Sequence, residues 1–139
     1  MDLKIKPKDM ITYFLIGLFI LYILYSKGMI LADFHFLTSQ EAAQTIKNEE
    51  NNVTILDVRT LEEYKSLGHI KNAVLVPLQE LENNIDALKK FKDKKILVYC
   101  ASGNRSIAAS RILEKNGFNT YNMNGGIQSW QNKGYEISK

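Results

Sequence analysis

The first clear pattern along the chain is an uncharged, almost wholly apolar run, residues 10–26, between Asp9 and Lys27. As a helix rising about 1.5 Å per residue, it would cover roughly 25 Å of a hydrocarbon core that is about 30 Å thick. Apolar residues behind Lys27 extend the run, and no polar face recurs at helical spacing, as a soluble helix would require. We therefore expect an uncleaved transmembrane helix. A cleaved signal peptide is the alternative, but no small-residue cleavage site of the A-x-A type follows the run.

The lysines around this run predict an orientation. Lys4, Lys6 and Lys8 precede it, and only Lys27 follows closely. Because positive residues favour the cytoplasmic side, the N-terminus is expected in the cytoplasm and the rest of the chain outside it. We expect residues 1–32 to form a cytoplasmic tail and membrane anchor, and residues 33–139 to form one domain.

Beyond residue 33 the pattern changes to short β-branched runs that alternate with amphipathic segments. The runs that predict strands are residues 53–58, 73–77, 95–99 and 120–123. The segments that predict helices are residues 42–46 behind a capping box at 38–41, then 62–67, 78–88, 107–113 and 127–133. This alternation predicts an α/β fold, a central parallel sheet with helices on both faces.

Composition and charge exclude several classes of protein. The chain is 45% hydrophobic and 24% charged, which excludes a disordered or collagen-like chain. Of its net charge of +3, residues 1–32 carry +2, from four Lys and two Asp. A domain left with a charge of +1 lacks the basic surface of a nucleic-acid-binding protein, so no nucleic-acid partner is expected.

The chain has one cysteine, Cys100, which excludes an intramolecular disulfide. His35 and His69 show no metal-ligand spacing with it, so neither a metal nor another cofactor is expected. A lone cysteine is either an inert core residue or a reactive thiol. The surrounding residues favour the second interpretation.

Cys100 directly follows a predicted strand and precedes a predicted helix, at the edge of the sheet where α/β proteins bind ligands. Gly103 and the small residues of the intervening loop allow backbone N–H groups to point at one centre. The helix N-terminus and Arg105 add positive charge. Together these features predict a thiol of lowered pKa and a pocket for an anion.

Over residues 38–137 the sequence resembles the rhodanese family. LDVR at 56–59, EY at 63–64 and GHI at 68–70, with Ala73 and Pro77, resemble its first signature. CASGNR at 100–105 resembles its active-site loop, and GGI at 125–127 with Trp130 and Gly134 resembles its C-terminal signature. One departure is Glu136, where the family often has a proline.

The resemblance implies a rhodanese-like fold and a sulfurtransferase that carries sulfur as a persulfide on Cys100. The donor would be a small sulfur compound such as thiosulfate, and the acceptor a thiol, cyanide or a protein. Cys100 and Arg105 would be catalytic, and Asp57 and Arg59 would hold the loop in shape, although a surface ion pair is an equal alternative for these two. The substrate-binding loop would comprise Ala101, Ser102, Gly103, Asn104 and Ser106.

Two other functions stay open. Cysteine phosphatases and arsenate reductases use a similar strand, loop and helix, but with five residues between cysteine and arginine, where this chain has four. A non-catalytic rhodanese-like module that binds a partner at the membrane is the other alternative, although such modules often lack the cysteine.

Overall fold

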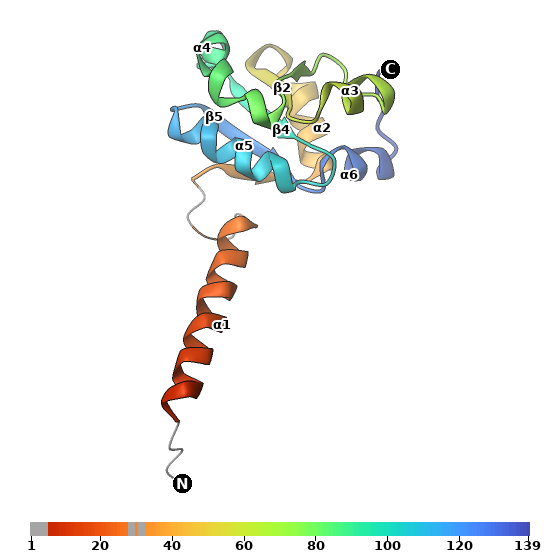
Figure 1. Cartoon of the computed structure of the whole chain (residues 1–139). Coiled ribbons are helices and arrows are strands. Elements are labelled where there is room, and N and C mark those ends of the chain that lie inside the picture. The colour runs from red at the N-terminus through yellow and green to blue at the C-terminus, as the bar shows by residue number, and fades with distance from the viewer. Residues whose placement is uncertain (1–5, 28–29, 31–32) are drawn as a thin grey trace. The chain divides into compact units, whose positions relative to one another are not determined.

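The computed structural model describes residues 6–27, 30 and 33–139, and the chain divides into two compact units, residues 1–32 and 33–139 (Figure 1). In the first unit, α1 (Pro7–Ser26) begins with a proline at its first turn. Its stretch Lys8–Ser26 is long and apolar enough to cross a membrane, and no part of it is buried in the protein. Lys4 and most of the apolar extension behind Lys27 lie outside the described residues.

The second unit contains a five-stranded parallel sheet in the order β1-β5-β4-β2-β3. The strands are β1 (His35–Leu37), β2 (Val53–Asp57), β3 (Val74–Leu75), β4 (Lys95–Tyr99) and β5 (Asn119–Met123). The α/β prediction is confirmed. The central position of β4 matters most for function, since it places the residue after Tyr99 in the middle of the carboxyl edge.

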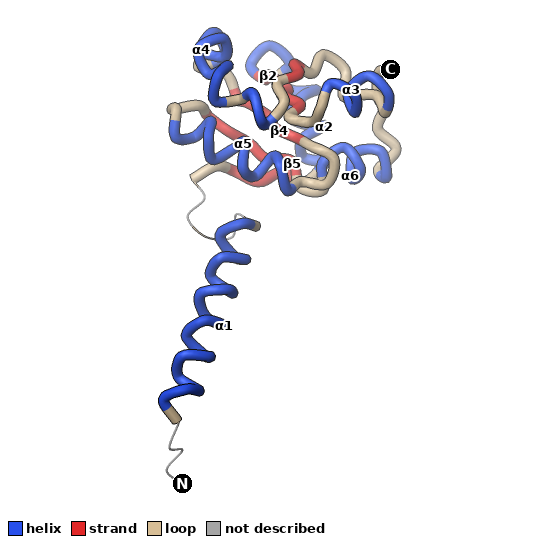
Figure 2. Tube along the Cα trace, in the orientation of Figure 1, coloured by secondary structure: helices blue, strands red, loops and turns tan. Residues whose placement is uncertain are grey.

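Helices cover both faces of this sheet (Figure 2). They are α2 (Ser39–Asn48), α3 (Leu61–Ser66), α4 (Ile85–Leu88), α5 (Asn104–Lys115) and α6 (Gly126–Asn132), with short 3-10 turns at residues 50–52, 78–80, 82–84 and 89–91. On one face Val98 packs with Leu113 of α5, and on the other Leu97 packs with Ala42 of α2 and Trp130 of α6. Alternate residues of β4 thus anchor two hydrophobic cores.

The single helix predicted over residues 78–88 is wrong. This segment is broken into 3-10 turns and the short α4. The side chain of Asn84 donates to the carbonyl oxygen of Glu80 at 2.8 Å, while its backbone N–H bonds to Leu81. The side chain therefore occupies the carbonyl that the backbone N–H of Asn84 itself would use in an α-helix.

Two strands also differ from expectation. The predicted strand 73–77 contributes only β3, because the N–H of Ala73 bonds to Ile70 in a turn and Pro77 has no N–H to donate. The edge strand β1 was not predicted. Its three residues are too few for a periodic pattern, and their pairing with β5 decides their conformation.

Candidate active site

Cys100 lies directly after β4 and is 1% exposed. The backbone N–H of Gly103 donates to its Sγ at 3.1 Å. Gly103 has φ +106° and precedes the first turn of α5, a twelve-residue helix whose N-terminus carries partial positive charge. The thiol also lies 3.6 Å from Ser106 Oγ, and that hydroxyl donates to the carbonyl of Gly103 at 3.0 Å. The Gly103 N–H and the helix N-terminus are placed to stabilise negative charge on the sulfur, whereas Ser106 Oγ accepts from the thiol.

The remaining loop residues divide by exposure. Ser102 and Asn104 are exposed and Ala101 is half-buried, so these three can meet a substrate. Gly103 and Ser106 are buried, so they shape the loop rather than line a pocket. The hydroxyl of Ser106 contacts the sulfur and the loop backbone, and its expected part in substrate binding stays a prediction.

The turn at Gly125 and Gly126 supports this loop from the other side. The N–H of Ile127 donates to the carbonyl of Cys100 at 2.9 Å, and that of Gln128 donates to Ala101 at 3.1 Å. Gly126 has φ +57°, and a Cβ built on it would lie 2.4 Å from the carbonyl oxygen of Cys100. Only glycine allows this approach, which explains why a GG pair stands at this point of the chain.

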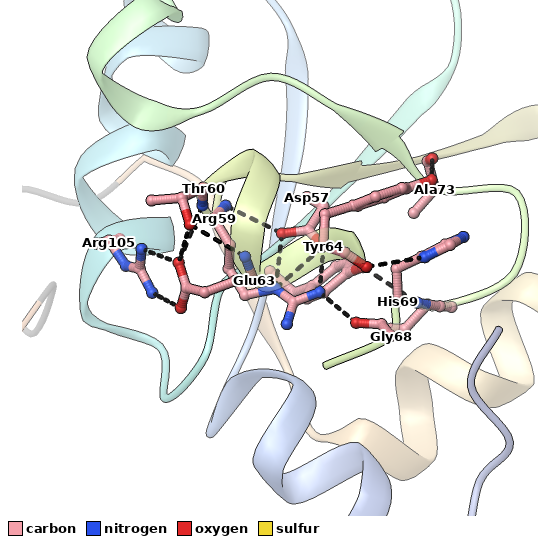
Figure 3. A network of polar contacts seen from close by, with 11 residues as sticks. Asp57, Arg59, Thr60, Glu63, Tyr64, Gly68, His69, Ala73 and Arg105 are labelled. Atoms are coloured by element: carbon pink, nitrogen blue, oxygen red, sulfur yellow. Dashed lines mark hydrogen bonds and ion pairs between the residues drawn. The ribbon is translucent and has the colours of Figure 1, made fainter. Parts of the chain in front are cut away.

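Arg105 does not extend as an unpaired cation. Its guanidinium forms a two-point ion pair with Glu63 of α3, at 2.8 Å to Oε2 and 2.6 Å to Oε1 (Figure 3). The same Oε2 accepts from the N–H and the hydroxyl of Thr60, which completes a capping box at the start of α3. Hydrogen bonds from Arg105 and Thr60 hold the pKa of Glu63 at about 2, and Glu63 raises the pKa of Arg105.

Asp57 and Arg59 form a second, fully buried pair beside it, 0% and 1% exposed, which excludes a surface ion pair. Arg59 donates to both Asp57 oxygens, at 3.0 Å and 2.7 Å, and to the carbonyl of Gly68 at 2.7 Å. This pair ties the end of β2 to the turn at residue 68 (Figure 3). The charge of Asp57 also contributes to the raised pKa of Arg105, after the larger effect of the hydrogen bond to Glu63.

The ring and backbone of His69 make packing and hydrogen-bond contacts with Tyr64 and Ser138. Its ring stacks on Tyr64 with centroids 3.7 Å apart, and Nδ1 lies 3.3 Å from the carbonyl of Tyr64 (Figure 3). Its backbone pairs with that of Ser138. These contacts give the residue a structural role. Within residues 6–27, 30 and 33–139 no group of three or more His, Cys, Asp or Glu side chains could hold a metal ion.

Glu63 is the site residue that sequence reasoning missed. The spacing of Thr60 and Glu63 predicts a helix cap, and that signal was available in the sequence. Its partner, Arg105, lies 42 positions away, so only the tertiary fold, which places α3 next to the first turn of α5, brings the two together.

Comparison with known proteins agrees with this geometry. Residues 38–133 match the rhodanese-like domain family. The chain is 37% identical over 97 residues to a tRNA uridine(34) hydroxylase of Hamiltonella defensa, covering 66% of this chain but 26% of that protein. The chain thus spans about a quarter of the length of that curated relative.

Two solved structures are also similar. A rhodanese-related protein from Thermoplasma volcanium is 36% identical, with a TM-score of 0.68 over 76% of this chain and 98% of that one. A Rhodopseudomonas palustris protein, described as a possible tyrosine phosphatase, is 26% identical, with a TM-score of 0.72 over 81% and 91% of the two chains. The family match spans β2 to β5, the cysteine loop and the GG turn described above, and this chain belongs to the rhodanese-like domain family.

Proposed function

We propose that this chain is a sulfurtransferase that moves sulfane sulfur from a donor such as thiosulfate to a thiophilic acceptor through a persulfide on Cys100. The Cys100 thiolate attacks the outer sulfur of the donor, and the bond from that sulfur to the rest of the donor breaks. The leaving group departs with the electron pair. A thiol, cyanide or a protein acceptor then takes the outer sulfur and regenerates the thiolate.

The observation that carries the proposal is the hydrogen bond from the Gly103 N–H to Cys100 Sγ at the N-terminus of α5. Such a donor stabilises a thiolate and later the persulfide anion. A non-catalytic binding module would need no such donor at its cysteine, so this bond favours the catalytic alternative. Four residues separate Cys100 from Arg105, one fewer than in cysteine phosphatases, which favours sulfur over phosphoryl transfer.

The test is intact mass spectrometry of the full chain in detergent after exposure to thiosulfate or methanethiosulfonate. One added sulfur on the wild type, its loss on adding cyanide, and its absence from Cys100→Ser support the proposal. Equal sulfur loading of Cys100→Ser would contradict it. Hydrolysis of aryl phosphates by the wild type in the same preparation would favour the phosphatase alternative.

We further propose that α1 anchors the protein as a single membrane span through residues 10–26, with the catalytic domain outside the cytoplasm. The apolar surface of α1 supports the span, and the lysines before it support the orientation. The hydroxylase relatives are several times longer than this chain, so the activity in their name is not proposed here.

A further inference from the structure

The charged side chains around the cysteine loop are matched in two pairs. Arg105 is the only charged residue of the segment 100–106, and Glu63 binds it at two points. Asp57 and Arg59 neutralise each other beside them. Among the described residues of this site, these four side chains sum to zero charge, and the Cys100 thiolate then adds a negative charge.

This charge balance affects how strongly the site attracts or repels an anionic donor. An unpaired arginine would offset the repulsion between a dianion such as thiosulfate and the thiolate. Here both Glu63 oxygens already face the guanidinium, at 2.6 Å and 2.8 Å. Glu63 stays ionised at neutral pH because the pKa of its carboxyl is held at about 2. A dianionic donor would therefore have to displace a carboxylate that Thr60 also holds in place.

Resting on the sulfurtransferase function proposed above, we infer that Glu63 is a positioning and specificity-determining residue that selects donors of low charge. The favoured class is an organic thiosulfonate or persulfide carrying at most one negative charge. The reaction needs no further reactant. The Cys100 thiolate attacks the terminal sulfane sulfur, the bond from that sulfur to the sulfonyl sulfur or thiol sulfur breaks, and a sulfinate or thiolate leaves with the electron pair.

Thiosulfate and methanethiosulfonate test this inference, because they have similar size and the same reacting sulfur but charges of −2 and −1. The quantity to measure is kcat/KM for methanethiosulfonate divided by kcat/KM for thiosulfate, with the full chain in detergent. Comparison of this ratio between variants cancels the intrinsic reactivity of the two donors. Glu63→Gln should lower the ratio about fivefold or more, mainly by improving thiosulfate use.

Two features make the substitution informative. Glutamine at this position can still accept from Thr60 and complete the capping box, so α3 should keep its cap. Glu62→Gln is the matched control, since it removes the same charge from the adjacent, exposed position of α3 and should leave the ratio unchanged. An equal ratio in the wild type and a folded Glu63→Gln would overturn the inference.

A measurement on the wild type alone covers the case in which Glu63→Gln does not fold. Added salt screens charges beyond about 8 Å at 0.15 M. If the site repels dianions, kcat/KM for thiosulfate should rise with salt relative to methanethiosulfonate. A relative fall would show that Arg105 acts as an available cation and would overturn the inference. Failure of both donors to load sulfur on Cys100 would instead refute the sulfurtransferase proposal itself.

Discussion

The carbonyl oxygen of Cys100 accepts a hydrogen bond from the backbone N–H of Ile127 at 2.9 Å, so the first turn of α6 holds the residue that carries the sulfur. This contact requires the close approach of Gly126, where an added Cβ would meet the carbonyl oxygens of Cys100 and Ala101 at 2.4 Å and 2.6 Å. The C-terminal GG turn is therefore part of the active site, although it carries no reactive group.

Gly126→Ala should displace the cysteine loop. We expect it to lower sulfur loading of Cys100 at least tenfold and to destabilise the protein by roughly 3 kcal/mol, from backbone strain together with the clash. Gly134→Ala is the control, since Gly134 also has positive φ (+78°) but open space around the added Cβ. It should cost about 1 kcal/mol, from backbone strain alone, and leave loading unchanged. An equal loss of sulfur loading in Gly126→Ala and Gly134→Ala would contradict the steric explanation.

The buried Asp57–Arg59 pair should matter for stability more than for chemistry. Arg59→Met leaves Asp57 as an uncompensated buried charge and takes the donor from the Gly68 carbonyl. We expect a loss of about 3–5 kcal/mol in the free energy of unfolding, measured by urea denaturation of the full chain in detergent. The double variant Asp57→Asn with Arg59→Met should lose less than the single one. A larger loss in the double variant would show that the charge of Asp57 is not the cause.

The pKa of Glu63 predicts a pH dependence of stability. Its carboxyl titrates near 2 in the folded protein against 4.5 as the reference value, so its stabilising effect is complete above about pH 4.5 and is lost as pH falls toward 2. The difference in unfolding free energy between the wild type and Glu63→Gln should therefore shrink by on the order of 2 kcal/mol across this window. Glu62→Gln should show no such trend. A difference that stays constant with pH would contradict the ion-pair explanation.

Arg105 should act through its pair with Glu63. Arg105→Ala leaves the Glu63 carboxylate without its cationic partner near the cysteine loop, and we expect kcat/KM for thiosulfate to fall roughly tenfold. Arg105→Lys should recover part of it, because lysine restores the charge without the two-point geometry. Combining Arg105→Ala with Glu63→Gln should also recover part of the loss. Strict additivity of the two single effects would show that the residues act independently.

The orientation proposed for the domain can be tested in intact cells. In a Cys100→Ser background, Lys133→Cys places a new thiol on an exposed position of the domain. A membrane-impermeant maleimide should label it before lysis if the domain lies outside the cytoplasm. Labelling only after lysis would place the domain inside and leave the sulfurtransferase proposal unaffected.

The sequence by itself determined the elements whose signals are local. The β-branched runs of β2 and β4, the capping box at Thr38 and the glycine that ends α5 all depend on neighbours within a few positions. The placement of Cys100 between a strand and a helix could be predicted for the same reason, since strand, cysteine, Gly103 and helix follow one another directly. The break in the segment 78–91 could not be predicted from the sequence. The side chain of Asn84 competes for a backbone carbonyl, and this leaves the hydrophobic spacing of a helix intact.

Only the tertiary structure decided which distant groups meet at the cysteine. Glu63 and Arg105 each have an adequate local interpretation, a helix cap and a loop cation, and nothing in their spacing says that they neutralise each other. The same holds for Gly126, whose need for glycine comes from carbonyl groups 25 and 26 positions earlier. Charge pairing and close backbone approach depend on positions in space, which a parallel sheet sets by bringing remote strand ends to one edge.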